Sequence, residues 1–154
     1  MSNYESTNVY DVYEDIAHHF NVTRTYEWSW VRRFHESLLK ASYVLDIGCG
    51  NGRNIEFYKD LHLIEGIDSC YEFVRICLEK NLPVIQGNMC YMPYCHESFD
   101  ALTVIASFHH LDCEENRIEA LNEMNRVLKP GGKILIVSFH SIEDKIVKYF
   151  FSNF

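Results

Sequence analysis

The stretch Tyr43–Gly52, YVLDIGCGNG, decides the fold. A short, mostly apolar run with an acidic residue near its end, Asp46, is followed there by three glycines at alternate positions. The apolar run Tyr43–Ile47 predicts a buried strand, and the residues from about Asn54 predict a helix. A strand, a glycine turn and a helix in this order open an α/β fold with a parallel sheet.

The spacing of the glycines disfavours a dinucleotide as the ligand. A dinucleotide site needs G-x-G-x-x-G, but the third glycine here, Gly52, comes one residue early and Arg53 stands where the last glycine belongs. We therefore expect a ligand that lies flat against bare backbone, with Gly48 and Gly50 leaving room for it.

The rest of the chain alternates apolar runs with helical patterns, which predicts one domain over residues 1–154, with a helical cap at 1–41 and an α/β core at 42–154. Further strands are predicted at Leu61–Ile67, Leu82–Gln86, Ala101–Ile105 and Lys133–Phe139. Helices are predicted at Val9–Phe20, Ser29–Leu39, Tyr71–Lys80, Glu115–Leu128 and Ile142–Phe151. The turn Lys129–Gly132, KPGG, is expected to end the helix before it.

Two further groups of residues mark strand ends where a ligand binds. Asp68 closes the second strand about twenty residues after the glycines, where an acid can accept hydrogen bonds from both ribose hydroxyls of an adenosine-type cofactor. The same aspartate is also a common helix N-cap, and both roles stay open. Asn88 and Met89 follow the third strand and are expected at the edge and face of an adenine.

Composition limits the possible classes of protein. The 154 residues are 47% hydrophobic and 23% charged, which fits a globular domain, and the formal net charge of −8 offers no overall basic surface for nucleic acid. The polar, acidic start and the lack of a long apolar run favour a cytoplasmic or nuclear protein without a membrane partner. Six cysteines show no metal-ligand spacing, so no metal site is expected.

These motifs, with FDALTVIASFHHL and VLKPGGKILI, resemble the class I S-adenosylmethionine-dependent methyltransferases over Ser42–Phe139. The resemblance implies a Rossmann-like parallel sheet of order 3-2-1-4-5, with helices on both faces and an N-terminal helical cap. It implies S-adenosylmethionine as cofactor, held by Asp46, Gly48, Cys49, Gly50, Asn51, Asp68, Ser69, Asn88, Met89 and Ala106. The family more often has Asp in the position of Asn88. Its members continue with two more strands, so with an end at Phe154 the C-terminal strands are expected to be missing, from a fragment or a trimmed form.

The residues after the fourth strand bear on the methyl acceptor. Ala106–Leu111, ASFHHL, stands where amine methyltransferases carry an Asn- or Asp-Pro-Pro-aromatic clamp, which disfavours amine chemistry. This segment and Val12–Phe34 resemble the eukaryotic tRNA methyltransferases that esterify 5-carboxymethyluridine at the wobble position. The resemblance implies that Arg24 and a histidine, His110 in preference to His109, line the substrate pocket. It also implies tRNA as substrate and a heterodimer with a small zinc-binding activator protein.

Two alternatives remain open at this point. A methyltransferase for a small carboxylate metabolite is favoured by the net charge of −8. A cofactor-binding subunit without activity of its own is favoured by the expected lack of C-terminal strands.

Overall fold

A computed structural model describes residues 27–138 and 141–152 of the chain. The strands β1 (Tyr43–Ile47), β2 (Leu63–Asp68), β3 (Val84–Gln86), β4 (Phe99–Ile105) and β5 (Leu128–Val137) form one five-stranded sheet. All neighbouring strands pair in parallel, and their order is β3-β2-β1-β4-β5, which confirms the expected order. Because β1 is central, the glycine turn that follows it lies in the middle of the row of strand ends.

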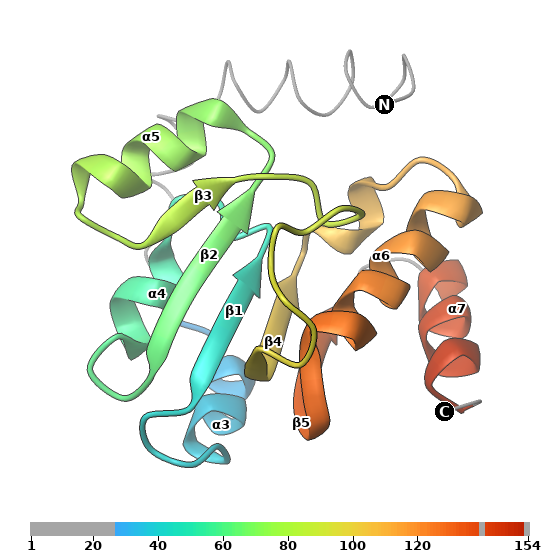
Figure 1. Ribbon diagram of the computed structural model, residues 1–154, viewed down its shortest axis with the longest axis horizontal. Helices are drawn as coiled ribbons and strands as arrows, with labels where there is room; N and C mark the ends of the chain where they lie inside the picture. Colours follow the sequence, from blue (N-terminus) through green and yellow to red (C-terminus); the bar gives the residue numbers. More distant parts are fainter. Residues whose placement is uncertain (1–26, 139–140, 153–154) are drawn as a thin grey trace.

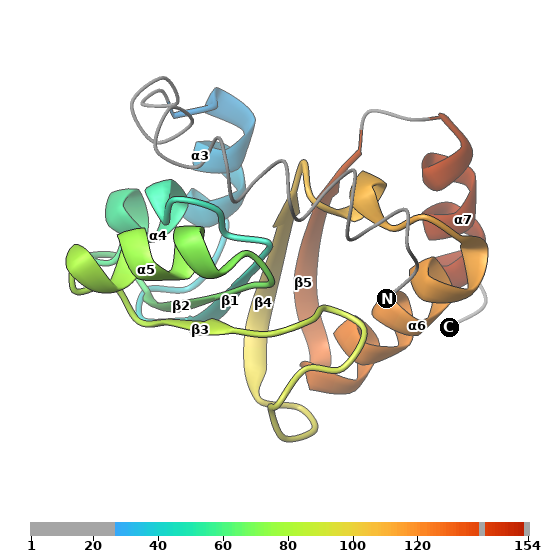
Figure 2. The same cartoon turned by 90° about the horizontal axis from the view of Figure 1, so that it is seen from above.

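Helices cover both faces of the sheet, as expected for a Rossmann-like fold. On one face lie α3 (Ser29–Glu36), α4 (Arg53–Tyr58) and α5 (Tyr71–Glu79), and on the other lie α6 (Glu114–Val127) and α7 (Ser141–Ser152) (Figure 1 and Figure 2). A short 3-10 helix, η2 (Phe108–His110), connects β4 to α6. Of the predicted cap, α3 is confirmed, whereas Val9–Phe20 lies outside the described residues.

Two apolar layers hold these helices against the sheet. Between the sheet and α6, the fully buried Phe99, Leu102 and Leu121 belong to the larger cluster of core residues. Under α4 and α5, Ile55 and Val74 belong to a second cluster that reaches Phe34 and Leu38 of the α3 segment. In the part of the chain that the structure describes, no helix has the length and apolarity needed to cross a membrane.

The predicted starts of β2 and β3 are each two residues too early. The amide of Leu61 donates to the carbonyl of Tyr58 (2.9 Å), so this residue still belongs to the turn that ends α4. Likewise, the amide of Leu82 donates to the carbonyl of Cys77 (2.9 Å) at the end of α5. Local turn hydrogen bonds therefore delay both strands, although the residues are apolar.

The expectation that Lys129–Gly132 forms the end of the preceding helix is wrong. α6 already ends at Val127, and Leu128 is extended and pairs with Phe99 of β4. The next pair in the register joins Ala101 to Lys133, so the KPGG segment is an irregularity within β5. Pairing with β4 therefore ends the helix before the proline and glycines are reached.

A buried histidine holds α3 against the end of α4. The ring of His35 is fully buried and stacks on Tyr58, with ring centroids 3.7 Å apart. His62 bonds to the carbonyl oxygen of His35 through Nε2 (3.1 Å), and the hydroxyl of Tyr58 donates to Glu27 (2.6 Å). Burial, reinforced by the nearby His62 and only partly opposed by Glu27, lowers the pKa of His35 to about 4.

We expect the free energy of unfolding to fall as the pH is lowered from 6.5 towards about 4, because the unfolded chain then binds a proton that native His35 does not. The slope is at most ~1.4 kcal/mol per pH unit for one proton. His35→Phe keeps the stacking and should flatten this slope in urea titrations at several pH values. The lowered pKa of His110 adds to the slope and the raised pKa of Asp46 opposes it, so the result is the difference in slope between His35→Phe and the parent chain.

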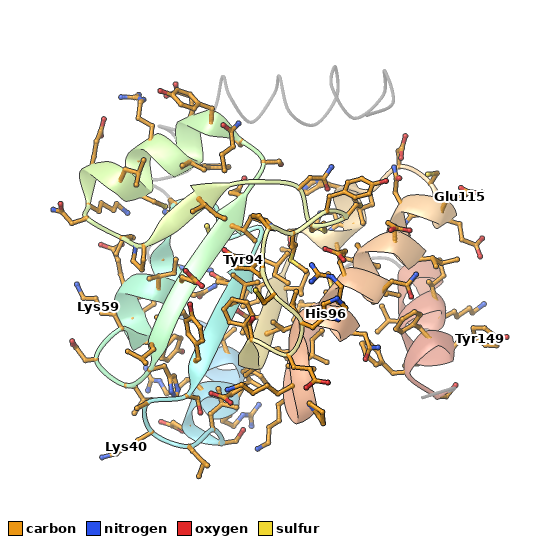
Figure 3. The ribbon with its side chains drawn as sticks, in the orientation of Figure 1. Lys40, Lys59, Tyr94, His96, Glu115 and Tyr149 are labelled. Carbon is orange, nitrogen blue, oxygen red and sulfur yellow. The ribbon has the colours of Figure 1, made fainter. Side chains whose placement is uncertain are left out.

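His96 offers a matched control for this experiment, since it lies exposed on the loop before β4 (Figure 3). His96→Phe should leave the slope as in the parent chain. An unchanged slope in His35→Phe would contradict the assignment of His35 as a buried neutral group.

Candidate functional site

A cavity of about 330 Å³ opens where β1, β2, β3 and β4 end. This volume is within the range of small-molecule sites, and the carboxyl ends of parallel strands are where such folds bind ligands. Eleven of the site residues expected from the sequence line this cavity: Gly48, Cys49, Gly50, Asn51, Asp68, Ser69, Asn88, Met89, Ala106, His109 and His110. Arg24 lies outside the described residues, and Asp46 is not among the lining residues.

The glycine turn after β1 is held by its neighbours on both sides. Gly48 has φ +70°, and its amide donates to the carbonyl of Ile67 (2.8 Å). A Cβ on Gly48 would lie 2.3 Å from the Cβ of Ser107, so the space that this glycine leaves open is occupied by the turn after β4. The hydroxyl of Ser107 in turn donates to the carbonyl of Ile47 (2.9 Å). The backbone of the turn after β1 therefore packs directly against the Ser107 side chain of the turn after β4.

Asp68 ties the end of β2 to the glycine turn. Its side chain is 9% exposed, one oxygen accepts from the amide of Gly50 (2.8 Å) and the other from the amide of Cys70 (2.9 Å). The second bond is the short-range turn that an aspartate makes before a helix. A carboxylate oxygen has two lone pairs, so an oxygen that accepts from a backbone amide can also accept from a ligand hydroxyl. The expectation of Asp68 as the helix N-cap is wrong, because the N-cap of α5 is Cys70, and Asp68 instead accepts from the amide of that residue.

Asp46 lies beneath the cavity and supports it. It is 1% exposed, and its carboxylate accepts from Thr103 (2.7 Å) and from the side-chain amide of Asn54 (3.4 Å). Burial raises the pKa of Asp46 to about 6, despite these two hydrogen bonds. The side chain thus joins β1 to β4 and to the start of α4 from below.

At the other end of the cavity, the turn after β3 presents Asn88 and Met89. The side-chain oxygen of Asn88 accepts from the amide of Cys90 (2.8 Å), so one of its lone pairs already stabilises the turn. Met89 packs against the larger core cluster, and Phe73 of α5 also lines the cavity. An amide edge beside apolar side chains suits the edge and face of a flat heterocycle.

The turn after β4 forms the opposite wall. Ala106 adopts φ +56°, which is uncommon for a residue with a side chain, and its amide donates to the carbonyl of Val137 (3.0 Å). The rings of His109 and His110 follow, with centroids 4.1 Å apart. Burial, and to a smaller extent His109, lowers the pKa of His110 to about 4. Near pH 7 its ring therefore offers one donor and one acceptor without a positive charge.

Two further wall residues, Trp28 and Arg53, are not among those expected from the sequence. Trp28 immediately precedes α3, and Arg53 is the first residue of α4. The guanidinium carbon of Arg53 lies 5.0 Å from the centroid of the Trp28 ring, within the range of a cation–π interaction. The position of Arg53 directly after the glycine turn is the sequence signal that could have placed it in the site. Trp28 has no such signal, and only the packing of α3 shows that it reaches the same cavity.

Comparison with known proteins gives one family. The model of a family described as a methyltransferase domain matches residues 45–136. Among curated proteins, the tRNA (carboxymethyluridine(34)-5-O)-methyltransferase of Xenopus tropicalis is 42% identical over 88% of this chain, which spans 21% of that protein. Its namesake in Arabidopsis thaliana is 40% identical over 86% of the chain, spanning 32% of that protein. The chain thus spans about a fifth to a third of these relatives.

Solved structures share the fold. A chain from the complex between the Haloferax volcanii Trm112 methyltransferase activator and a methyltransferase aligns with a TM-score of 0.70 at 20% identity, over 82% of this chain and 58% of that one. A SAM-dependent methyltransferase from Archaeoglobus fulgidus aligns with a TM-score of 0.67 at 20% identity, over 92% and 73% of the two chains. At this level of sequence identity, both alignments show a shared fold and nothing about function.

The contact between the two turns predicts that Gly48→Ala is strongly destabilising. The new methyl group would meet Ser107 at 2.3 Å in addition to the strain of a positive φ, so we expect a loss above the ~1–2 kcal/mol of left-handed strain alone. Gly131→Ala is the matched control, because Gly131 has φ +75° and nothing within 4 Å of its added Cβ. Urea denaturation of both variants measures the difference, and equal losses would contradict the packing described here.

Proposed function

The chain belongs to the methyltransferase domain family, and from this premise we propose that it transfers the methyl group of S-adenosylmethionine to the carboxylate of 5-carboxymethyluridine at the tRNA wobble position. The product is the methyl ester. The whole activity is a proposal, because the chain spans only part of the relatives whose names carry it.

The residues around the cavity fit this cofactor. The observation that carries the assignment is Asp68, a nearly buried carboxylate whose two oxygens are held by backbone amides at the edge of the cavity. We assign the ribose hydroxyls to Asp68, the methionine chain to the backbone of Gly48–Asn51, and the adenine to Asn88 and Met89. When bound, S-adenosylmethionine supplies a methyl group on a positively charged sulfur.

The wall opposite the adenine end supports a carboxylate acceptor. A carboxylate with a pKa near ~4 is already ionised at neutral pH, so the protein need not supply a general base. His110, neutral there because burial lowers its pKa to about 4, can donate one hydrogen bond. Correct positioning of reacting groups is worth up to roughly 7–11 kcal/mol. We assign this positioning to His110, with His109 beside it, and to Arg24.

A small activator protein is the proposed partner of a heterodimer. β3 pairs with β2 on one side, and in the described part of the chain its other edge carries no strand. Ile85 on this strand is 38% exposed. A strand of a partner added there would satisfy unpaired backbone groups and cover apolar surface. The activator named in the Haloferax volcanii complex suggests the kind of partner, and we propose that the one used here binds zinc.

Removal of the Asp68 carboxylate tests the cofactor assignment. Asp68→Ala loses two charge-assisted hydrogen bonds to ribose, each worth about 1.5–3 kcal/mol, so calorimetry should find binding of S-adenosylmethionine weakened at least tenfold. Asp68→Asn keeps the size of the side chain and one acceptor oxygen, so its affinity should fall between those of the parent and Asp68→Ala. Asp60→Ala removes an exposed carboxylate and should bind as the parent does. Unchanged affinity in Asp68→Ala, with the fold intact by circular dichroism, would sink the assignment.

Methyl transfer itself is measured with radiolabelled S-adenosylmethionine and tRNA prepared with and without the carboxymethyl group, with the activator co-expressed. Label should enter only the carboxymethylated tRNA and should be released by mild alkali. Arg24→Ala and His110→Ala should each lower turnover tenfold or more, about 1.4 kcal/mol, with cofactor affinity nearly intact.

Three other outcomes would each contradict the proposal. Label that survives alkali would mean an amine or carbon product. Transfer to free carboxylate metabolites but not to tRNA would identify a small-molecule enzyme. Tight cofactor binding without transfer to any tRNA would identify a non-catalytic subunit.

A further inference from the structure

The cavity has two electrostatically different ends. Asp68, at the end of β2, is its one anionic side chain among the described lining residues. Arg53 is the one permanently charged cation among the same residues. A ligand that fills the cavity therefore meets both a carboxylate and a guanidinium.

Packing places the guanidinium on the β4 side of the cavity. Trp28 and Ala106 both pack against one small cluster, formed by Val31, Tyr58 and Ile105. Ile105 is the last residue of β4 and Ala106 follows it, so Trp28 packs in the same cluster as that strand end. Arg53 begins beside the glycine turn after β1, but its guanidinium carbon is 5.0 Å from the Trp28 centroid. The charge therefore lies beside a ring that packs in the same cluster as the end of β4, and His109 and His110 follow that strand.

The Trp28 ring restricts where this guanidinium can lie. Trp28 also stacks on Trp30, with centroids 4.9 Å apart and an interplanar angle of 28°. A ring held by its neighbour is a fixed platform, and an arginine against it loses less freedom when it binds a ligand. The planar guanidinium can then offer two parallel N–H groups to a carboxylate.

Among the described residues, no other lysine or arginine lines the cavity. Lys40 lies before the start of β1 and Lys59 at the opposite end of α4 from Arg53, and both project outward in Figure 3. Lys80 donates to the carbonyl of Asn51 (2.9 Å) and pairs with Glu56 (3.1 Å). Within the described chain, the cationic charge in the cavity is therefore that of Arg53.

From this arrangement we infer that Arg53, held against Trp28, binds the carboxylate of the methyl acceptor and makes the acceptor subsite selective for anions over neutral analogues. The inference rests on the proposed methyl transfer and adds to it a residue and a cause of specificity. Trp28 is a positioning residue, because it acts through the orientation of Arg53.

Nucleoside binding tests the subsite without any need for turnover. The chain, co-expressed with its activator and saturated with S-adenosylhomocysteine, is titrated with 5-carboxymethyluridine and with its neutral amide, 5-carbamoylmethyluridine. We expect the parent to prefer the carboxylate at least tenfold, and Arg53→Gln to lose most of this preference. Arg53→Lys keeps the positive charge, which also lowers the pKa of Asp46. It lacks the two parallel N–H groups of the guanidinium, so it should recover only part of the preference for the carboxylate.

Kinetics and cofactor binding complete the test. With carboxymethylated tRNA, Arg53→Gln should raise KM at least tenfold, while the Kd for S-adenosylmethionine changes less than twofold. Trp28→Leu should also raise KM, and Trp28→Phe should largely restore it. Arg75→Gln is the matched control, because Arg75 lies on the outside of α5 and pairs with Glu72 and Glu79 (2.6 and 2.7 Å).

The outcomes separate this inference from the proposed function. A tenfold loss of S-adenosylmethionine affinity in Arg53→Gln would overturn the inference, because the guanidinium would then serve the carboxylate of the cofactor. Equal binding of the two nucleosides by the parent would overturn it as well. Selective nucleoside binding without any methyl transfer would refute the proposed function and leave the anion subsite standing.

Discussion

The architecture of the site depends on the close contact between Gly48 and Ser107. A β-carbon at Gly48 would lie 2.3 Å from that of Ser107, so the turns after β1 and β4 can approach only through a glycine. The hydroxyl of Ser107 closes the contact by donating to Ile47, and Asp68 adds the turn after β2 through the amide of Gly50. Three strand ends are thereby fixed relative to one another before any ligand binds, and such preorganisation lowers the cost of orienting a cofactor and an acceptor.

This frame divides the cavity into two chemically distinct parts. The ends of β2 and β3 carry a carboxylate and an amide beside apolar side chains, which suits an adenosine. Two histidine rings follow the end of β4, and Arg53 of α4 lines the same cavity with its guanidinium against the ring of Trp28. The net charge of −8 repels an anionic acceptor at long range, so local charge must provide the attraction in this part. A proposed partner subunit at the β3 edge would add surface for a tRNA without altering this division.

Much of this could be predicted from the sequence, because the decisive signals are local. The glycine motif and the alternation of apolar runs with helices predict a parallel sheet flanked by helices, and the family resemblance implies its strand order. Nine of the ten residues that the resemblance implies for the cofactor line the cavity. Asp46 differs because its position at the strand end does not reveal which way its side chain points, and it is buried beneath the turn. Trp28 could not be predicted, since it reaches the cavity only through the docking of α3, which depends on the stacking of His35 on Tyr58. The KPGG segment lies within β5 and does not end the helix as expected, because Leu128 pairs with Phe99, which is distant in the sequence. A local sequence pattern does not reveal such a contact.

A crystal structure of the chain with S-adenosylhomocysteine and 5-carboxymethyluridine tests the central claim most directly, namely that a preformed frame holds the cofactor at one end and an anionic acceptor at the other. The account predicts both ribose hydroxyls within hydrogen-bonding distance of Asp68, an unchanged contact between Gly48 and Ser107, and the nucleoside carboxylate against the guanidinium of Arg53. A ribose bound away from Asp68, or a glycine turn that separates from Ser107 to admit the ligand, would contradict it.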